Sequence, residues 1–413
     1  MADNTGTAAP TTEVLVIGGG YAGVMAANRL TQRDDVSVTL INTRPDFVDR
    51  IRLHQLVGGS HDAVVDYGRM LAARVRLVVD TVTRIDAPVR SLTLASGSTL
   101  GYDHLIYAVG SGSALPDVPG AADFAYPIAT LEEAERLRPV VAAAPASAPV
   151  TVVGAGPTGI ETAAELAEEG RAVTLVCGGE LGPYLHPRGR RSVADRLASL
   201  GVTVLDGPGT HVTAVTADSV RLADGREVPS RVTIWSAGFG VPDLARRSGL
   251  STDELGRLRT DETLTSVDDV RIVATGDAAA PSDLPYRMSC QAAVQLGPQA
   301  AETVLRRIAG EQPRAAEVAF VSQCISLGRR AGIFQTASKD DIARPYYFAG
   351  RPGAKIKEFI CRGIVWQLRF EARRPGAVAW WMKDGKRAAA VRAAAQPPVA
   401  EAESQGNRSA AVR

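Results

Sequence analysis

The amino-acid sequence predicts an α/β fold, because one strand–turn–helix pattern is written twice along the chain. In each copy an apolar, β-branched run meets a Gly-x-Gly-x-x-Gly motif and continues into an Ala-rich helical stretch. The glycines are Gly18, Gly20 and Gly23 in the first motif and Gly154, Gly156 and Gly159 in the second. In this context each motif predicts a Rossmann-like dinucleotide-binding domain, so we expect two.

The three glycines of each motif have separate physical functions. The first allows a tight turn, the second lets a pyrophosphate approach the backbone, and the third lets helix and strand pack closely. The diphosphate then lies on the helix N-terminus, where Tyr21 and Ala22 follow the first loop and Thr158 lies in the second. A chain that binds two dinucleotides usually passes a hydride between them.

The bulk composition excludes several classes of protein. The chain has 413 residues, with 46 Lys+Arg against 45 Asp+Glu. This balance gives no footprint for nucleic acid. No apolar run approaches the ~18–20 residues needed to cross a bilayer, and residues 1–12 lack the pattern of a signal peptide. We therefore expect no nucleic-acid partner and a cytoplasmic location.

The four cysteines are widely scattered and include no Cys-x-x-Cys pair. They are Cys177, Cys290, Cys324 and Cys361. This spacing argues against a redox-active dithiol, a disulfide framework and a structural zinc site. We expect no metal, and each cysteine is interpreted as a small apolar residue.

The pattern of apolar runs divides the chain into two nucleotide-binding domains and a third region. We expect residues 13–121 and 266–315 to form one domain, interrupted by an inserted domain at 122–265. Residues 316–394 are expected to form a smaller C-terminal α+β region. Residues 1–12 and 395–413 are low in apolar content and are predicted to be disordered tails.

Two further segments resemble signatures of pyridine-nucleotide-dependent flavoproteins. Residues 103–111 form an apolar strand that ends in Gly-Ser, and they resemble the segment that passes the bound FAD near Ala108 and Gly110. Residues 271–279 resemble the second FAD signature, with Gly276 and Asp277 delivered beside the cofactor. A carboxylate at Asp277 can accept hydrogen bonds from ribitol hydroxyls, or it can simply cap the next turn. The resemblance implies that the interrupted domain binds FAD and the inserted domain NAD(P)H.

A third segment sharpens the resemblance to type II NADH:quinone dehydrogenases. Residues 290–297 read Cys-Gln-Ala-Ala-Val-Gln-Leu-Gly, where that family has Ala-Gln-x-Ala-x-Gln-x-Gly. Gln291 and Gln295 share one helix face. Ala293 and Gly297 are small enough for a flat ring to come near. The resemblance implies a catalytic position along the flavin and quinone site; the alternative is a solvated helix face.

The second glycine motif also resembles the same family. Residues 156–166 place Glu161 where the family has a glutamate near the nicotinamide, which implies a catalytic contact. The alternative is a solvated glutamate favoured by the helix dipole. The Trp-Ser-Ala-Gly stretch at 235–238 matches a family segment beside the nucleotide, which implies cofactor contacts for Ala237 and Gly238. The resemblance covers residues 13–310 and is looser beyond 316.

The chain departs from the family at the ends of two strands where an acid is usual. In the first domain that position is Asn42, followed by Arg44, and both can still contact FAD. In the inserted domain the position is Cys177. An acid there commonly selects NAD, so the choice between NADH and NADPH stays open. Arg188, Arg190 and Arg191 could reach a 2′-phosphate or decorate a surface helix.

Two basic segments remain open to more than one interpretation. Arg50, Arg52 and His54 are candidates to hold the FAD pyrophosphate or a polar substrate, or they form a solvated helix face. Residues 356–370 and the tryptophans at 380–381 mix basic and aromatic side chains. Such a stretch suits the inner face of a membrane, a homodimer contact or an ordinary core.

The resulting hypothesis is an FAD-dependent NAD(P)H dehydrogenase with non-covalent FAD. A nicotinamide coenzyme would give hydride to the flavin, which would pass electrons to a quinone-like acceptor near Gln291 and Gln295. One alternative is a specialised biosynthetic flavoenzyme that acts on a soluble metabolite. The other is a redox-sensing flavoprotein with slow turnover.

Overall fold

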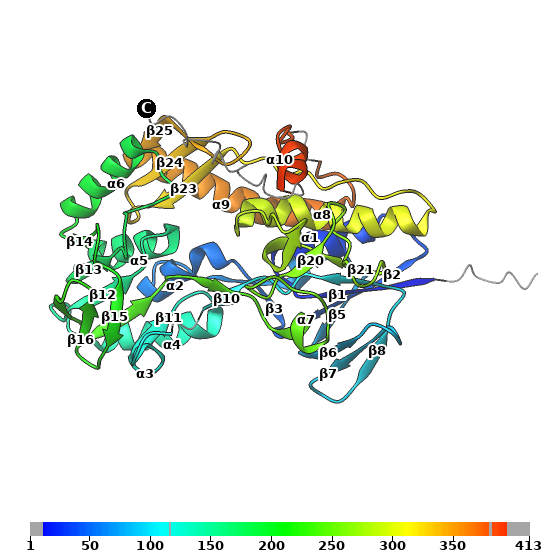
Figure 1. Ribbon diagram of the computed structural model, residues 1–413, viewed down its shortest axis with the longest axis horizontal. Coiled ribbons are helices and arrows are strands. Elements are labelled where there is room, and N and C mark those ends of the chain that lie inside the picture. The colour runs from blue at the N-terminus through cyan, green and yellow to red at the C-terminus, as the bar shows by residue number, and fades with distance from the viewer. Residues whose placement is uncertain (1–10, 115–116, 380–381, 395–413) are drawn as a thin grey trace, which may run out of the picture.

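The computed structural model describes residues 11–114, 117–379 and 382–394. Most of the two predicted tails and the tryptophans at 380–381 therefore lie outside the described residues. The predicted α/β architecture is confirmed, and the described residues include two five-stranded parallel sheets and three three-stranded antiparallel sheets. Figure 1 shows the two parallel-sheet units side by side, with the C-terminal elements lying along one side of both.

The first unit is built on a parallel sheet in the order β21-β9-β1-β2-β5. These strands are almost continuously apolar, as expected for a sheet covered on both faces. Their bounds are β1 (Thr12–Ile17), β2 (Val36–Asn42), β5 (Val75–Val79), β9 (His104–Tyr107) and β21 (Ile272–Ala274). Helices α1 (Tyr21–Leu30) and α8 (Cys290–Ile308) pack on one face, and an antiparallel meander lies on the other side. The meander comprises β6 (Val82–Asp86), β7 (Ser91–Leu94) and β8 (Thr99–Gly101).

The second unit repeats this plan in the order β11-β18-β12-β13-β14. Its strands are β11 (Ala125–Pro127), β12 (Val150–Val153), β13 (Val173–Val176), β14 (Thr203–Leu205) and β18 (Val232–Trp235). Its helices are α3 (Ala121–Phe124), α4 (Leu131–Ala143), α5 (Pro157–Glu168) and α6 (Pro187–Ser199). A meander of β15 (Val212–Val215), β16 (Ser219–Leu222) and β17 (Glu227–Pro229) covers one side. A capping box between Thr130 and Glu133 starts α4.

The C-terminal region is an antiparallel sheet followed by a long helix. The strands are β23 (Ser322–Ser326), β24 (Gly332–Ala337) and β25 (Ala343–Ala349), and the helices are α9 (Gly350–Arg373) and α10 (Arg387–Ala394). The sheet packs near α5 and α6 of the second unit, and α9 runs from this sheet to α1 of the first unit (Figure 1). This region thus bridges the two units.

Short elements complete the fold. They are β3 (Asp46–Val48), η1 (Arg50–Arg52), α2 (Leu53–Gly58), β4 (Val64–Asp66), η2 (Tyr67–Arg69), β10 (Gly112–Ser113), β19 (Phe239–Gly240), α7 (Leu244–Arg247), β20 (Leu258–Thr260), η3 (Gly276–Ala278) and β22 (Ala279–Pro281). The chain leaves the first unit at β10 and returns at β19, and these two strands pair with each other. Two connections therefore cross between the units at one place.

One expectation about boundaries needs correction. Leu244, Leu250 and Leu258 pack in the first unit's core, so the chain re-enters that unit soon after β19 rather than at residue 266. The segment from Val75 to Asp86 forms two strands, because a bend at Asp80 separates β5, in the parallel sheet, from β6, in the meander.

Candidate functional site

The first glycine loop has the crowding that its sequence predicts. Gly18 has φ +99°, and a Cβ there would collide with the Ala108 carbonyl. A Cβ on Gly23 would collide with the Gly18 carbonyl, so both ends of the loop require glycine. In contrast, a Cβ on Gly20 would have no atom within 4 Å. The absence of a side chain at Gly20 therefore keeps space open beside the α1 N-terminus, which no side chain caps.

The second glycine loop repeats this arrangement. Gly154 has φ +109° and lies against Ser236 and Ala237, where a Cβ would come within 2.8 Å of the Ala237 amide nitrogen. A Cβ on Gly159 would collide with the Gly154 carbonyl, and one on Gly156 would again meet nothing within 4 Å. Helix α5, whose first turn includes Thr158, begins here without a side-chain cap. Both loops can receive a diphosphate on a free helix N-terminus.

The predicted FAD-binding residues gather around the first loop. The Ser111 hydroxyl donates to Asp277 Oδ2 at 2.7 Å, and Arg50 Nη1 donates to Ser111 Oγ at 3.2 Å. Arg50 Nη1 lies 3.9 Å from Asp277 Oδ2. Gly110 and Gly276 have positive φ of 69° and 68°, and Gly276 packs against Ala22. A carboxylate and a guanidinium thus lie beside the strand ends that face this loop.

The side chains of Asn42 and Arg44 have partners within the protein that the sequence does not suggest. Asn42 Oδ1 accepts a hydrogen bond from the Gly19 N–H at 2.9 Å, so it braces the glycine loop. Arg44 forms an ion pair with Glu132 of α4, which links the first unit to the second. Tyr21 donates its hydroxyl to Asp49, and burial, together with that carboxylate, raises the pKa of Tyr21. The side chains of these residues therefore stabilise the loop region directly.

The residues present fit FAD at the first loop. The space beside Gly20 and the uncapped helix suit a pyrophosphate. The Asp277 carboxylate, which is 15% exposed, suits sugar hydroxyls. The second loop fits a dinucleotide for the same reasons at Gly156 and α5.

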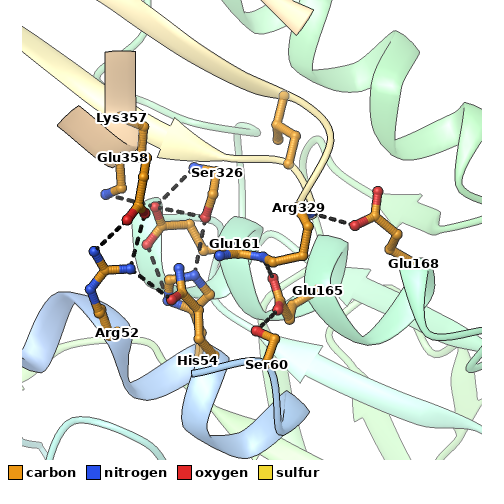
Figure 2. A network of polar contacts seen from close by, with 12 residues as sticks. Arg52, His54, Ser60, Glu161, Glu165, Glu168, Ser326, Arg329, Lys357 and Glu358 are labelled. Carbon is orange, nitrogen blue, oxygen red and sulfur yellow. Dashed lines mark hydrogen bonds and ion pairs between the residues drawn. The ribbon is translucent and has the colours of Figure 1, made fainter. Parts of the chain in front are cut away.

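Glu161 is at the centre of a buried polar network that joins four elements (Figure 2). Its Oε1 atom accepts hydrogen bonds from the Ser326 N–H and from Lys357 Nζ, both at 2.9 Å. His54 Nδ1 lies 3.6 Å from Glu161 Oε2, and a 3.0 Å hydrogen bond joins His54 Nε2 to Ser326 Oγ. The four residues come from α2, α5, β23 and α9. The interpretation of Glu161 as a solvated helix residue is therefore wrong, because it is 5% exposed.

Charge decides the protonation states in this network. Burial alone would raise the pKa of Glu161, but Lys357 and His54 lower it below the ordinary value. Burial opposes the charge of Lys357, yet Glu161 raises the pKa of that ammonium. Burial lowers the pKa of His54 to about 4. The charges of Lys357, Arg329 and Arg52 also lower this pKa, and the Glu161 carboxylate opposes them. At neutral pH the network contains an ion pair beside a neutral imidazole.

An outer ring of ion pairs closes this network. Arg52 reaches both oxygens of Glu358 at 3.1 Å and Asp49 at 3.2 Å. Arg329 Nε lies 2.9 Å from Glu165. Arg52 and His54 are only 4% and 3% exposed, so the interpretation of these residues as a solvated helix face is wrong. The charge of Arg52 and the hydrogen bonds of both side chains are therefore committed to protein partners.

Three glutamines on α8 pair with an extended segment at 317–322. Gln295 donates to the Ala319 carbonyl and accepts from its N–H, both at 3.1 Å. Gln299 bonds both backbone groups of Glu317. Gln291 can pair in the same way, at 3.2 Å, with Val321 N–H and the Ser322 carbonyl. Each side-chain amide therefore acts like a neighbouring peptide group in a β-ladder.

This glutamine ladder changes the meaning of the predicted helix face. The alternative of a solvated face is wrong for Gln295, which is 1% exposed. The geometry gives Gln291 and Gln295 a structural function, and contact with an electron acceptor stays a prediction. Gly297 does not border an open space, since a Cβ there would collide with the Ala22 carbonyl. Its small size lets α8 pack tightly on α1.

Sequence reasoning missed Lys357 and Ser326. A usable signal was present for the lysine, because the buried positions of α9 include Gly353, Cys361, Ile364 and Leu368. Lys357 falls on this stripe, four residues from both Gly353 and Cys361. A cation on a buried stripe requires an anionic partner. The partner, Glu161, lies in another unit and could not be identified from spacing.

The family of the chain follows from comparison with known proteins. Residues 12–298 match the family model described as pyridine nucleotide-disulphide oxidoreductase. The chain therefore belongs to this family. Membership confirms the predicted class, an oxidoreductase that uses FAD and a nicotinamide coenzyme. All four cysteines are free thiols, as their spacing predicts.

Individual relatives are named as NADH dehydrogenases. The chain is 31% identical over 358 residues to an NADH dehydrogenase-like protein of Mycobacterium tuberculosis, covering 78% of this chain and 87% of the relative. It is 28% identical over 345 residues to the type II NADH:quinone oxidoreductase Ndh of the same species, covering 73% of each. The predicted resemblance is thus confirmed.

Solved structures share the fold at lower identity. NDH2 from Plasmodium falciparum, in complex with NADH, matches with a TM-score of 0.74 at 15% identity, covering 88% of this chain and 97% of that one. The sulfide:quinone oxidoreductase of Aquifex aeolicus matches with a TM-score of 0.73 at 20% identity, covering 89% and 93%. Within the described residues, no helix is both long and apolar enough to span a membrane.

Proposed function

We propose that the protein is an FAD-dependent NAD(P)H dehydrogenase that delivers electrons to a quinone-like acceptor. The observation that carries this proposal is the pair of glycine loops in one chain, each with free space at its second glycine. The relatives named type II NADH:quinone oxidoreductase support the choice of acceptor. When bound, FAD supplies the redox chemistry, taking hydride from the coenzyme and giving electrons to the acceptor.

The protein's own residues bind, orient and supply charge. The first loop and Asp277 would hold the FAD, and the second loop would hold the coenzyme diphosphate. Glu161, two residues after Gly159 on α5, is our candidate for the contact with the nicotinamide, where an ionised carboxylate can accept an amide hydrogen bond. Reduction of a quinone consumes two protons, and Lys357 is a protonated group beside this glutamate, with its Nζ 2.9 Å from Glu161.

The structural surroundings disfavour the biosynthetic alternative. That alternative needed cations near Arg52 that were free for a polar substrate. Arg52 is instead paired with Glu358 and Asp49, and His54 is buried and neutral. Among the described residues, the basic loop therefore offers Arg50 alone, which faces Ser111 and Asp277.

We propose that NADH is preferred over NADPH, with Asp206 supplying the acid that Cys177 lacks. The Cys177 N–H donates to the Leu205 carbonyl at 2.8 Å, so the carboxyl ends of β13 and β14 lie together. Asp206 directly follows β14, is exposed, and has no ion pair within the described ranges. A 2′-phosphate in this region would meet that carboxylate. Arg190, a candidate for NADPH binding, is paired with Glu180.

We also propose a membrane-surface contact through the outer face of α9. Exposed Lys355, Phe359, Arg362 and Trp366 follow one another at helical spacing. Phe359 and Trp366 are 77% and 59% exposed. Basic and aromatic residues on one face suit a lipid interface. Sedimentation with vesicles tests this contact, since F359A/W366A should weaken binding; unchanged binding would contradict it.

Steady-state turnover tests the main proposal. FAD-loaded protein should oxidise NADH faster with a short-chain quinone than with oxygen alone. Glu161→Gln should lower this turnover, while Glu180→Gln, an exposed glutamate in the same unit, should leave it unchanged. Equal rates with and without quinone would exclude the proposed acceptor class. They would favour the redox-sensing alternative.

A further inference from the structure

A groove between η2 and the end of α9 collects three arginines. Its volume is about 570 Å³, and its lining includes Arg69, Arg369 and Arg373 together with Gly68, Ala72 and Ala372. Pockets of this size hold small ligands. No carboxylate belongs to the lining.

These three arginines differ from the arginines around them. Arg29, Arg33 and Arg74 each form an ion pair with a neighbouring carboxylate. Across the described ranges, the three groove arginines form none. The Nε atom of Arg369 is enclosed by protein and has no hydrogen-bond partner among the described residues. An enclosed donor without a partner costs free energy, so the hydrogen bonding of the Arg369 guanidinium is not satisfied by the described residues.

The groove is preformed, because a buried asparagine fixes its two walls. Asn28 Nδ2 donates to the Met70 carbonyl at 2.8 Å and to the Leu368 carbonyl at 3.3 Å. Its Oδ1 atom accepts from the Ala72 N–H at 2.9 Å. The segment after η2 and the last turns of α9 are thereby held together. The backbone positions of Arg69 and Arg369, next to Met70 and Leu368, are therefore held close to each other.

Helix electrostatics explain only part of this arrangement. The negative end of the α9 dipole favours cations in its last turn, which accounts for Arg373 but not for Arg369, which precedes that turn. It does not account for Arg69, which comes from a different element. Asp66, the carboxylate nearest to Arg69 in sequence, accepts a hydrogen bond from the Gly68 N–H and does not line the groove. The positive charge of the groove is therefore uncompensated by its own walls.

We propose that this groove binds the phosphate group of an anionic ligand. Guanidinium groups bind phosphate oxygens bidentately, and three of them match a group that carries up to two negative charges. The phosphate can belong to a soluble phosphate ester or to a phospholipid headgroup. No residue of either glycine loop lines the groove, and the proposal does not depend on the proposed function.

Binding to two probes tests the site. The FAD-loaded full chain, with excess NAD⁺ to fill the second glycine loop, is titrated with glycerol phosphate by calorimetry. In parallel it is sedimented with phosphatidylcholine vesicles that contain or lack phosphatidylglycerol. The test variant is R69Q/R369Q/R373Q. The matched control is R84Q/R136Q/R138Q, which removes the same charge at exposed positions outside the groove.

We expect the test variant to abolish binding of one probe and each single substitution to weaken it by about tenfold. The control should bind like the wild type. Glycerol phosphate as the affected probe would identify a soluble ester, and phosphatidylglycerol alone would identify a lipid headgroup. Equal binding by all three proteins, equal loss in both variants, or no binding of either probe would overturn the proposal. FAD content and melting temperature show whether each variant is folded.

Discussion

Lys357 Nζ and Glu161 Oε1 lie 2.9 Å apart, and this contact joins the C-terminal region to the second nucleotide-binding unit. Both side chains are largely buried, at 12% and 7% exposure. Removing one partner of such a pair leaves an uncompensated buried charge, which is more costly than losing the attraction itself. The pair therefore couples the folding of α9 to the position of the proposed catalytic glutamate.

We predict that Glu161→Gln lowers the free energy of unfolding by about 3–5 kcal/mol, because Lys357 stays buried without a carboxylate. Denaturant unfolding measures the effect. The double variant E161Q/K357M should recover much of the loss. The control Glu180→Gln breaks an exposed pair and should cost at most ~1 kcal/mol. Equal losses in the two glutamate variants would contradict a special role for the buried pair.

We predict that stability falls as pH drops from 6.5 towards 4. The His54 pKa is 6.5 in the unfolded chain and about 4 in the fold, so across this window only the unfolded chain binds the proton. Stability therefore rises with pH by at most about 1.4 kcal/mol per unit. The lowered pKa of Glu161 adds a further loss below about 4.5. His54→Gln should flatten the dependence of stability on pH between 6.5 and about 4, whereas the control His211→Gln, at an exposed position, should leave it unchanged. If the two variants gave the same profile, His54 would not be the origin of the pH dependence.

We predict that Gly156→Val prevents reduction of the flavin by NAD(P)H and leaves FAD bound. The valine side chain meets no protein atom within 4 Å of its Cβ, and Gly156 has φ −72°, which valine tolerates. It would occupy the space of the coenzyme diphosphate. FAD content and anaerobic reduction rates are measured. A wild-type KM for NADH would show that the loop does not bind the coenzyme.

We predict that Gln295→Ala destabilises the fold rather than selectively slowing the quinone half-reaction. The substitution leaves the Ala319 N–H and carbonyl without their 3.1 Å partners, at a cost of about 1–3 kcal/mol each. Hydrogen exchange at residues 317–321 and unfolding by denaturant report the change. Slower reoxidation by quinone at unchanged stability would instead support the acceptor contact that the sequence suggests.

We predict that Asp206→Ala narrows the preference for NADH by about tenfold in kcat/KM, or ~1.4 kcal/mol, by removing repulsion of a 2′-phosphate. Kinetics with both coenzymes measure the ratio. The control Asp123→Ala removes an exposed acid elsewhere in the same unit and should leave the ratio alone. If the wild type used both coenzymes equally, the assignment of Asp206 would be wrong.

The sequence predicted the two nucleotide loops because their constraints are local. Gly18 and Gly154 have a positive φ, and a Cβ on Gly23 or Gly159 would collide with the carbonyl of Gly18 or Gly154. The spacing of the glycines was therefore enough to identify both loops. The strand end at Asp277 was similarly visible, since the strand and the carboxylate adjoin in the chain; its contact with FAD stays a prediction.

The polar network could not be predicted, because its members come from distant segments. Arg52 and His54 have partners in distant segments, Glu358 of α9 and Ser326 of β23, and no local pattern indicates these contacts. Gln295 shows the opposite difficulty. Its position on the helix was predicted, but its partner, Ala319, lies in an extended segment without a recognisable pattern. Tertiary packing decided which polar groups are solvated.

Anaerobic stopped-flow spectroscopy of the FAD-loaded protein tests the central claim most directly. We predict that NADH bleaches the visible flavin absorbance in a first mixing step. A quinone in a second step should restore that absorbance faster than oxygen does. Failure of both NADH and NADPH to bleach the flavin, or restoration by oxygen but not by quinone, would contradict the proposed function.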